Sequence, residues 1–270
     1  FALGADIFKT ITPELSTLLS TKSRVAYRYG ERIPGNNQTA CVVSPYFYEE
    51  DNWVDDMELA AATLYRLNGQ EKDIKDADYW GQLEEISPWM ELGRARHYQF
   101  YPFVNIGHYY LARMAGSLIR EKYISYMKGG LECLNKRAKI YDDPFFYGIP
   151  YLWCSNNLVV AAITQARLYH QLSGDNNFLE MEAALRDWLF GCNPWGTSMI
   201  CGLPEDGDYP TRVHSFVTEM LHNIPYGGLV DGPIERIRYE SLAGIHLKYA
   251  DEYAPFQYGA AVYHDDPGDY

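Results

Sequence analysis

Apolar side chains recur every three or four positions along most of the chain up to about residue 190, and this spacing restricts the fold most. In "NWVDDMELAAATLYRLNG" the stripe consists of Trp53, Met57, Ala60, Ala61, Leu64 and Leu67. Such spacing places side chains on one face of an α-helix. Gly69 is positioned to end this helix, and "SNNLVVAAITQARLYHQLSG" shows a similar stripe that ends at Gly174. The pattern predicts helices that each bury one face.

Other segments carry helix signals of the same kind. They are expected at about Pro13–Tyr29, Asp73–Glu85, Val104–Ala115, Leu118–Ala138, and from an N-cap at Asp175 to about Phe190. A weak repeat, in which "AAATLYRLNG" resembles "AAITQARLYHQLSG", indicates helix pairs stacked in a solenoid or a closed toroid. Because no segment alternates convincingly with a period of two, the sequence predicts an all-α domain.

The amino-acid composition changes after Pro194, where the chain becomes rich in glycine and proline. We expect only short helices there, around Thr218 or within Ser241–Tyr249. Long structured loops attached to a helical array usually serve function. The predicted organisation is therefore a helical hairpin array over residues 1–194 and a loop-rich active-site region over residues 195–270.

Charge narrows the class of partner. The formal net charge of the 270 residues is −13, and the sequence pI is about 4.9. This balance repels nucleic acids and anionic membranes, and the longest aliphatic run, Leu158–Ile163, is too short to span a bilayer. The 24 tyrosines offer flat faces with a hydroxyl. These features suit a neutral polysaccharide, although most tyrosines are expected to line helix contacts.

The five cysteines have neither zinc-ligand spacing nor the density of a disulfide framework. Cys192 and Cys201 are close enough in sequence for a bridge to be considered. We expect free and mostly buried thiols instead.

Five phrases occur in one order along the chain: "WVDDMELAAATLYRLNG", "YLWCSNNLVVA", "DWLFGCNPWGTSMICG", "GGLVDGP" and "YHDDPGDY". Together they resemble glycoside hydrolase family 9, the inverting β-glycanases that include many cellulases. In the last phrase Tyr263, Asp265 and Tyr270 fill the first fixed places of the family's C-terminal signature. The glutamate of that signature, its proton donor, would follow Tyr270 by four positions, and the family's Asp-Ala-Gly-Asp motif is not found.

The resemblance therefore implies about the C-terminal two-thirds of a catalytic domain, an incomplete (α/α)6 toroid that lacks both its acid and its base. It implies an endoglucanase-like activity on β-1,4-linked glucans in the complete domain. This segment alone is expected to be inactive and to need the missing remainder of its own domain as a partner. The resemblance also implies that the bacterial protein is secreted, periplasmic or exposed on the cell surface.

The resemblance implies an active-site role for His214 and Asp265. Asp265 is expected to orient or polarise its neighbours, although an Asp-Pro-Gly-Asp stretch is also ordinary turn chemistry. His214 matches the histidine of a His-x-Arg motif whose third place is here Phe216, so Arg212 is the substitute candidate for the arginine. The predicted substrate-binding residues are Trp153, Tyr226, Arg212 and Asp269, where Trp153 could equally start a helix in the core.

An acidic stretch before the first long periodic segment corresponds to a calcium site in the family. The resemblance implies that Asp55 and Asp56 are its carboxylate pair, since calcium takes six to eight oxygen ligands. Acids in the first turn of a helix explain the same residues without metal. No cofactor is expected for the chemistry itself.

Two other function classes stay open at this point. One is a family relative of another kind, either a carbohydrate-binding protein that has lost its acid or base, or an exo-acting β-glucosidase or glucosaminidase. The other is an unrelated α-solenoid that binds protein, which the order of the five phrases disfavours.

Overall fold

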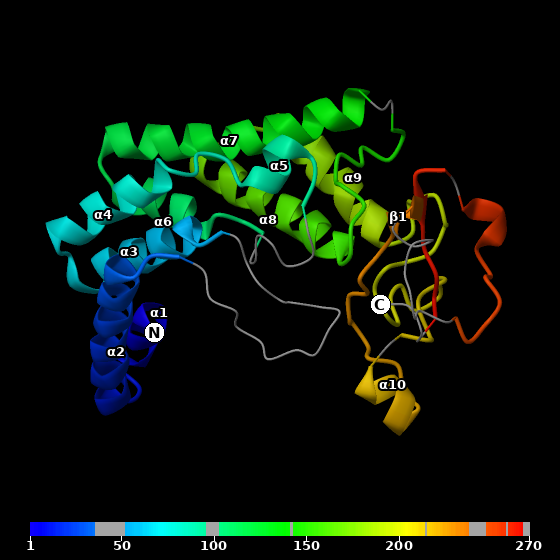
Figure 1. The fold of residues 1–270 in the computed structure, drawn as a ribbon, viewed down its shortest axis with the longest axis horizontal. Coiled ribbons are helices and arrows are strands. Elements are labelled where there is room, and N and C mark those ends of the chain that lie inside the picture. Colours follow the sequence, from blue (N-terminus) through cyan, green and yellow to red (C-terminus); the bar gives the residue numbers. More distant parts are fainter. Residues whose placement is uncertain are drawn as a thin grey trace. The chain divides into compact units, whose positions relative to one another are not determined.

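The computed structural model describes residues 1–35, 52–95, 103–140, 143–213, 215–237, 247–257 and 259–266. Within these ranges the fold is mostly helical (Figure 1). Chain contacts divide the protein into two compact units. Unit 1 is Phe1–Glu91, Tyr98–Glu132 and Leu168–Asp175, and unit 2 is Leu92–His97, Cys133–Arg167 and Asn176–Tyr270.

Unit 1 is built from paired helices around α3. Its elements are α1 (Ala2–Phe8), α2 (Pro13–Arg32), α3 (Val54–Asn68), α4 (Glu71–Gly81), most of α5 (Pro88–Leu92), α6 (Ile106–Met114) and the first part of α7 (Ser117–Ile140). The core includes Ala61, Leu64, Leu111 and Tyr123, each at most 1% exposed. Burial of such apolar faces stabilises these helices more than their intrinsic propensity does.

One buried ion pair ties α2 to α4 in this unit. Both terminal nitrogens of Arg24 lie 2.5 Å from the two carboxylate oxygens of Asp73, whose side chain is fully buried. This bidentate geometry satisfies the buried carboxylate. It fixes the register of α2 against the pair formed by α3 and α4.

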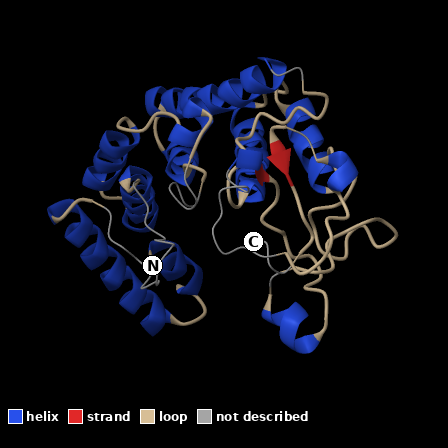
Figure 2. Ribbon diagram, turned by 45° about the vertical axis from the view of Figure 1, so that its right-hand side comes forward, coloured by secondary structure: helices blue, strands red, loops and turns tan. Residues whose placement is uncertain are grey.

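Unit 2 contains the last part of α7, most of α8 (Ser155–Ser173), and α9 (Leu179–Leu189). Its remaining elements are α10 (Phe216–Leu221), a 3-10 turn η1 (Ala254–Phe256), and the antiparallel strands β1 (Ile234–Glu235) and β2 (Ala261–Val262). Figure 2 shows the short strands in red among helices and loops. Ile234 pairs with Val262, so this small ribbon joins the segment before the C-terminal loop to the middle of unit 2.

The prediction of a mostly helical fold is confirmed, and so are several helix ends. Gly69 and Gly174 both take left-handed backbone angles, with φ of 66° and 71°, where α3 and α8 stop. The N-cap prediction at Asp175 is wrong, because α9 begins at Leu179 after Phe178. Asp175 instead accepts a hydrogen bond of 2.8 Å from the hydroxyl of Tyr169. The ribbon and α5 were not predicted.

Two smaller predictions concern chemistry and membranes. Cys133, Cys154, Cys192 and Cys201 carry free thiols, so the bridge considered between Cys192 and Cys201 is absent. Of these four cysteines, Cys154 and Cys201 are buried, and Cys41 lies outside the described residues. No helix in the described ranges is both long enough and apolar enough to cross a membrane.

Candidate functional site

The start of α8 is held by the loop that carries the "GGLVDGP" phrase. The backbone N–H of Asn156 donates to the carbonyl of Asp231 at 3.0 Å, and its side-chain amide donates to the carbonyl of Val230 at 2.8 Å. The hydroxyl of Ser155 donates to the carbonyl of Pro233 at 2.7 Å. These bonds satisfy donors at a helix N-terminus. They also bring two phrases that lie far apart in the sequence into direct contact.

The "FGCNPWGTSMICG" loop is closed by the buried side chain of Asn193. Its amide nitrogen donates to the carbonyls of Trp188 and Thr197 at 2.8 and 2.7 Å, and its oxygen accepts from the N–H of Trp195 at 3.1 Å. An asparagine that uses its donors and its acceptor in this way fixes a tight turn.

The end of the same loop pairs with residues 227–230. The N–H of Cys201 donates to the carbonyl of Gly228, and the N–H of Gly227 donates to the carbonyl of Cys201, both at 2.8 Å. The N–H of Val230 donates to the carbonyl of Met199 at 3.0 Å. Three of the five phrases therefore form one hydrogen-bonded layer.

Gln257 connects this layer to the C-terminal segment. Its side-chain oxygen accepts from the indole N–H of Trp195 at 2.8 Å and from the N–H of Tyr263 at 3.1 Å. Its amide nitrogen donates to the carbonyl of Tyr263 at 2.6 Å. The rings of Trp195 and Tyr263 meet edge to face with centroids 5.9 Å apart. Tyr263 is thereby fixed from both its backbone and its ring.

Two consecutive buried aspartates then hold two separate loops. Asp265 accepts hydrogen bonds from the N–H groups of Thr211 and Arg212 at 2.8 and 3.0 Å, and from the Thr211 hydroxyl at 3.2 Å. Asp266 accepts from the N–H groups of Lys248 and Tyr249 at 3.1 and 2.8 Å. We call this arrangement the Asp265–Asp266 clamp. Carboxylates that accept several N–H bonds are well stabilised even when buried.

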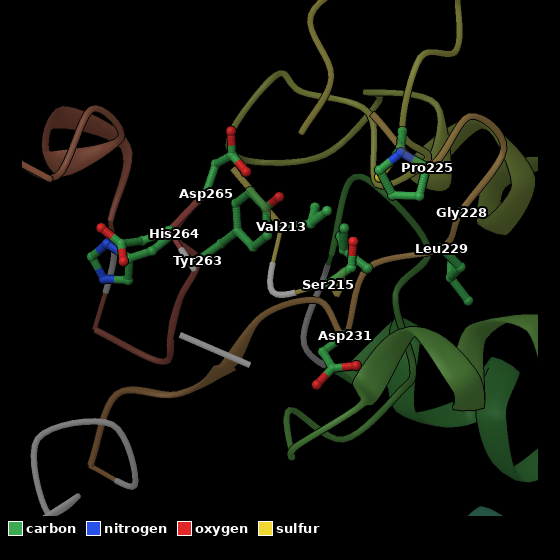
Figure 3. A pocket seen from close by; sticks show the side chains of 12 residues that line it. Val213, Ser215, Pro225, Gly228, Leu229, Asp231, Tyr263, His264 and Asp265 are labelled. Atoms are coloured by element: carbon green, nitrogen blue, oxygen red, sulfur yellow. The ribbon is translucent and has the colours of Figure 1, made fainter. Parts of the chain in front are cut away.

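The clamp borders a cavity of about 300 Å³, which is also lined by Cys201 and by the loop at residues 228–231. Figure 3 shows Tyr263, His264 and Asp265 on the C-terminal segment, with Asp231 and Leu229 on the loop before β1. Val213 and Ser215 complete another wall. The lining combines apolar surface with several convergent polar groups, which is the usual character of a ligand site.

The surroundings shift the pKa values of two titratable groups that line the cavity. Burial lowers the pKa of His264, and the nearby carboxylates of Asp251 and Asp266 oppose that effect. Burial, reinforced by the negative charge of Asp265, raises the pKa of the Cys201 thiol to about 11. A neutral imidazole and a protonated thiol therefore line the cavity near neutral pH, and Cys201 is no candidate nucleophile.

The predicted site residues fall in different places. Asp265 lines the 300 Å³ cavity. Arg212 does not line it, and its guanidinium lies over the ring of Tyr249, 4.6 Å from the ring centroid. Tyr226 is 70% exposed and packs close to Gly202, and Trp153 is half-buried. Neither lines the 300 Å³ cavity. His214 and Asp269 lie outside the described residues, so their roles stay predictions.

Sequence reasoning missed some residues that organise the site. Gln257 and Asn156 carry no motif signal, because an amide in a loop is ordinary until its partners are known. Asp266 was considered only as part of an acidic stretch. Asp266 directly follows the signature residue Asp265, and this position could have marked it for inspection.

The predicted calcium ligands, Asp55 and Asp56, lie in unit 1 near Asn52 and Glu84. Asp55 is buried and accepts a hydrogen bond from the Asn52 amide at 3.1 Å, while Asp56 is exposed. Oε1 of the buried Glu84 has no hydrogen-bond partner, and burial together with the Asp55 charge raises the pKa of Glu84 to about 8. The described residues hold no group of three or more His, Cys, Asp or Glu that could ligate a metal. The fit of calcium to these side chains is incomplete, and the site stays a prediction.

The chain is similar to known proteins in both sequence and fold. The family model described as glycosyl hydrolase family 9 matches residues 1–270. No curated protein matches the chain.

Solved structures show the same fold at low sequence identity. AaCel9A, in complex with a cellobiose-like isofagomine, is 20% identical, with a TM-score of 0.69 over 90% of this chain and 46% of its own. The family 9 endoglucanase J30 is 19% identical, with a TM-score of 0.72 over 100% of this chain and 48% of its own.

A family 9 protein of Bacteroides ovatus is 17% identical, with a TM-score of 0.68 over 86% of this chain and 45% of its own. The predicted (α/α)6 family fold, present in part, is thus confirmed. The chain spans about half the length of the solved structures it matches.

Proposed function

The chain belongs to glycosyl hydrolase family 9, and on this premise we propose that the full-length protein hydrolyses β-1,4-linked glucan polysaccharides or oligosaccharides with inversion at the anomeric carbon. The family match over the whole chain carries this proposal. The named ligand of AaCel9A, a cellobiose-like isofagomine, supports a β-glucan as the substrate class. The acidic balance of the chain is compatible with a neutral glycan.

Inverting hydrolysis needs a carboxylic acid that protonates the leaving oxygen and a carboxylate that activates water, about 6.5–9.5 Å apart. We propose that both groups come from parts of the protein beyond residues 1–270. The coverage of about half of each matched structure supports this division. The alternative, a protein that has lost one of the groups, would keep carbohydrate binding without turnover.

The residues of this chain would then shape and support the site. The Asp265–Asp266 clamp fixes the backbone at Thr211 and Arg212, two positions before His214. We propose that Asp265 acts as a positioning residue through this loop, and that His214 contacts sugar hydroxyls. Because its oxygens already accept three hydrogen bonds, Asp265 is poorly suited to donate a proton.

The test uses the full-length protein with cellooligosaccharides and mixed-linkage β-glucan. Proton NMR during turnover should show the α-anomer first, because inversion of a β-linkage yields an α-product. A first product in the β-form would contradict the proposal. Binding without any product would support the non-catalytic alternative, and release only from chain ends would identify an exo-acting enzyme.

A matched preparation of residues 1–270 alone separates the two parts of the proposal. We expect no turnover from it, since neither the acid nor the base is assigned within this segment. Turnover by residues 1–270 would show that the acid and the base both lie inside them.

A further inference from the structure

Unit 2 holds a second cavity, of about 500 Å³, that the proposed chemistry does not use. It is lined by the loop at Thr211 and Arg212, the end of α10 with His222, and the segment at Lys248 and Tyr249. We call it the basic cavity. None of the residues that line the 300 Å³ cavity lines this one.

The charges around the basic cavity are unlike those of the rest of the protein. Arg212 and Lys248 both line it, although the whole chain carries a formal net charge of −13. Glu219 is the acidic residue in its lining. The lining therefore holds two cations and one carboxylate, and Glu252 lies beside Arg212 without being part of the lining. Two cations side by side favour an anionic group by direct attraction.

Neither cation is tightly paired in the described structure. Nη1 of Arg212 lies 3.4 Å from Glu252, and Nζ of Lys248 lies 3.7 Å from Glu219. Charge-assisted hydrogen bonds are usually about 2.7–2.9 Å long. A guanidinium has five N–H donors and an ammonium has three. Both groups can therefore donate to a ligand while they keep these loose contacts.

An aromatic face accompanies the charges. Tyr249 is 51% exposed, and the guanidinium of Arg212 lies 4.6 Å from its ring centroid. A tyrosine ring offers an apolar face and a hydroxyl together, which suits a sugar ring with its equatorial hydroxyls. An isolated inorganic anion has no apolar face that could pack against this ring.

The basic cavity is also preorganised. The Asp265–Asp266 clamp holds the backbone N–H groups of Arg212 and Lys248 at 3.0 and 3.1 Å. His222 has a φ of 52°, a left-handed angle that is uncommon for residues other than glycine. A fixed arrangement of donors lowers the cost of ordering them on binding.

We propose that the basic cavity binds a uronic acid unit of a β-glycan, with Arg212 and Lys248 as partners of the sugar carboxylate and Tyr249 against the ring. The glycan part of this inference rests on the proposed function, whereas the carboxylate part rests on the charges. It extends the substrate class from neutral glucans to glycans that carry acidic units.

The test compares two disaccharides that differ at one carbon. Cellobiouronic acid carries a carboxylate where cellobiose carries a hydroxymethyl group, and binding of each to the full-length protein is measured by calorimetry at low salt. We expect the acid to bind about tenfold more tightly, since one well-placed charged hydrogen bond is enough for that ratio. The preference should fall as salt rises.

Substitutions in the basic cavity test whether the preference for the acid arises there. Arg212→Gln and Lys248→Gln keep the backbone N–H groups that the clamp holds, so both should fold, which thermal unfolding checks. Each should remove most of the preference for the acid, and Lys248→Gln should leave cellobiose binding unchanged. Lys128→Gln is the matched control, because Lys128 is also a surface lysine near a glutamate, at 3.6 Å from Glu132, but lies in unit 1. It should keep the preference.

Equal binding of the two disaccharides, or a preference that survives in the double variant, would overturn the inference. Displacement of cellobiouronic acid by acetate at equal concentration would show a simple anion site and would also overturn it. Hydrolysis of neutral glucan is measured separately. A working glucanase without acid preference would refute this inference and leave the proposed function standing.

Discussion

The carboxylate of Glu58 lies 2.8 Å from Nδ1 of His108, and the two side chains are 0% and 2% exposed. Nε2 of His108 faces the carbonyl of Glu85 at 3.2 Å, so the imidazole bridges α3 to the turn after α4. Burial raises the pKa of Glu58, and His108 opposes the rise. The pair is a polar contact inside the core of unit 1.

Removal of one partner of this pair should destabilise the protein strongly. Glu58→Leu or His108→Phe leaves the other group buried without its partner, which costs about 3–5 kcal/mol. The double variant should cost clearly less than the sum, because no unpaired group remains. Urea unfolding gives the three values. Glu71→Gln is the control, since Glu71 pairs with Lys75 on the surface, and additive costs would contradict this account.

Gly232 should tolerate alanine much less than Gly227 does. Both glycines have a positive φ, 89° and 78°, so alanine is strained at either by about 1–2 kcal/mol. A Cβ at Gly232 would also lie 2.4 Å from the side chain of Asn156, whereas nothing lies within 4 Å of a Cβ at Gly227. Gly232→Ala should therefore lower the Tm further than Gly227→Ala, and equal shifts would show that the start of α8 can yield.

Asp265→Asn should reduce kcat more than it changes KM in the full-length protein. The amide loses the charge that accepts the three hydrogen bonds from Thr211 and Arg212. Hydrogen bonds to a charged group contribute about 1.5–3 kcal/mol each, so we expect kcat to fall at least about tenfold.

Steady-state kinetics at two temperatures separates positioning from stability for this variant. If the loss of kcat disappears at the lower temperature, where the variant is fully folded, the positioning role is contradicted. Asp175→Asn, which alters a hydrogen bond in unit 1, is the control and should leave kcat unchanged.

His264 should make the protein less stable in acid. Its folded-state pKa is lowered by burial, although Asp251 and Asp266 attract the proton. The unfolded state therefore binds a proton at higher pH than the folded state does. The stability contributed by neutral His264 is complete above about pH 6.5 and is lost as the pH falls through the lower folded-state value.

Urea midpoints at a series of pH values test this assignment. His264→Gln should flatten the slope on the acid side of about pH 6.5. An unchanged slope would assign the acid sensitivity to other groups.

Calcium should raise the Tm of the full-length protein if the predicted site is real. Saturation at about 100 times the dissociation constant adds about 2.7 kcal/mol, and a chelator should reverse the gain. Asp55→Asn should abolish the response, whereas Asp6→Asn, a carboxylate that pairs with Arg66 on the surface, should keep it. A Tm that does not respond to calcium would remove the site from consideration.

The helical part of the fold could be predicted from sequence because its signals are local. A stripe of period 3.6 and a glycine that permits a left-handed angle both lie within one helix, as at Gly69 and Gly174. The prediction at Asp175 failed for a related reason. The helix begins at Leu179, four residues after Asp175, so the Asp175 side chain does not cap it and accepts from the Tyr169 hydroxyl.

The site could be predicted only in outline. The phrases marked the right segments, but their contacts join positions tens of residues apart, such as Ser155 with Pro233 and Trp195 with Gln257. No spacing in the sequence encodes those pairs. The same limit applies to Arg212, whose role in sugar binding stays a prediction, because no spacing in the sequence shows that its side chain lies over Tyr249.

The Asp265–Asp266 clamp also sets an order of events during synthesis. Thr211 and Lys248 emerge from the ribosome well before the two aspartates that hold their loops. The backbone contacts within a single helix are local and form quickly. The Thr211 loop, in contrast, is held by an aspartate 54 positions further along the chain. We expect the helices to form first on the growing chain. The 300 Å³ cavity and the basic cavity should form only after residue 266 has left the ribosome.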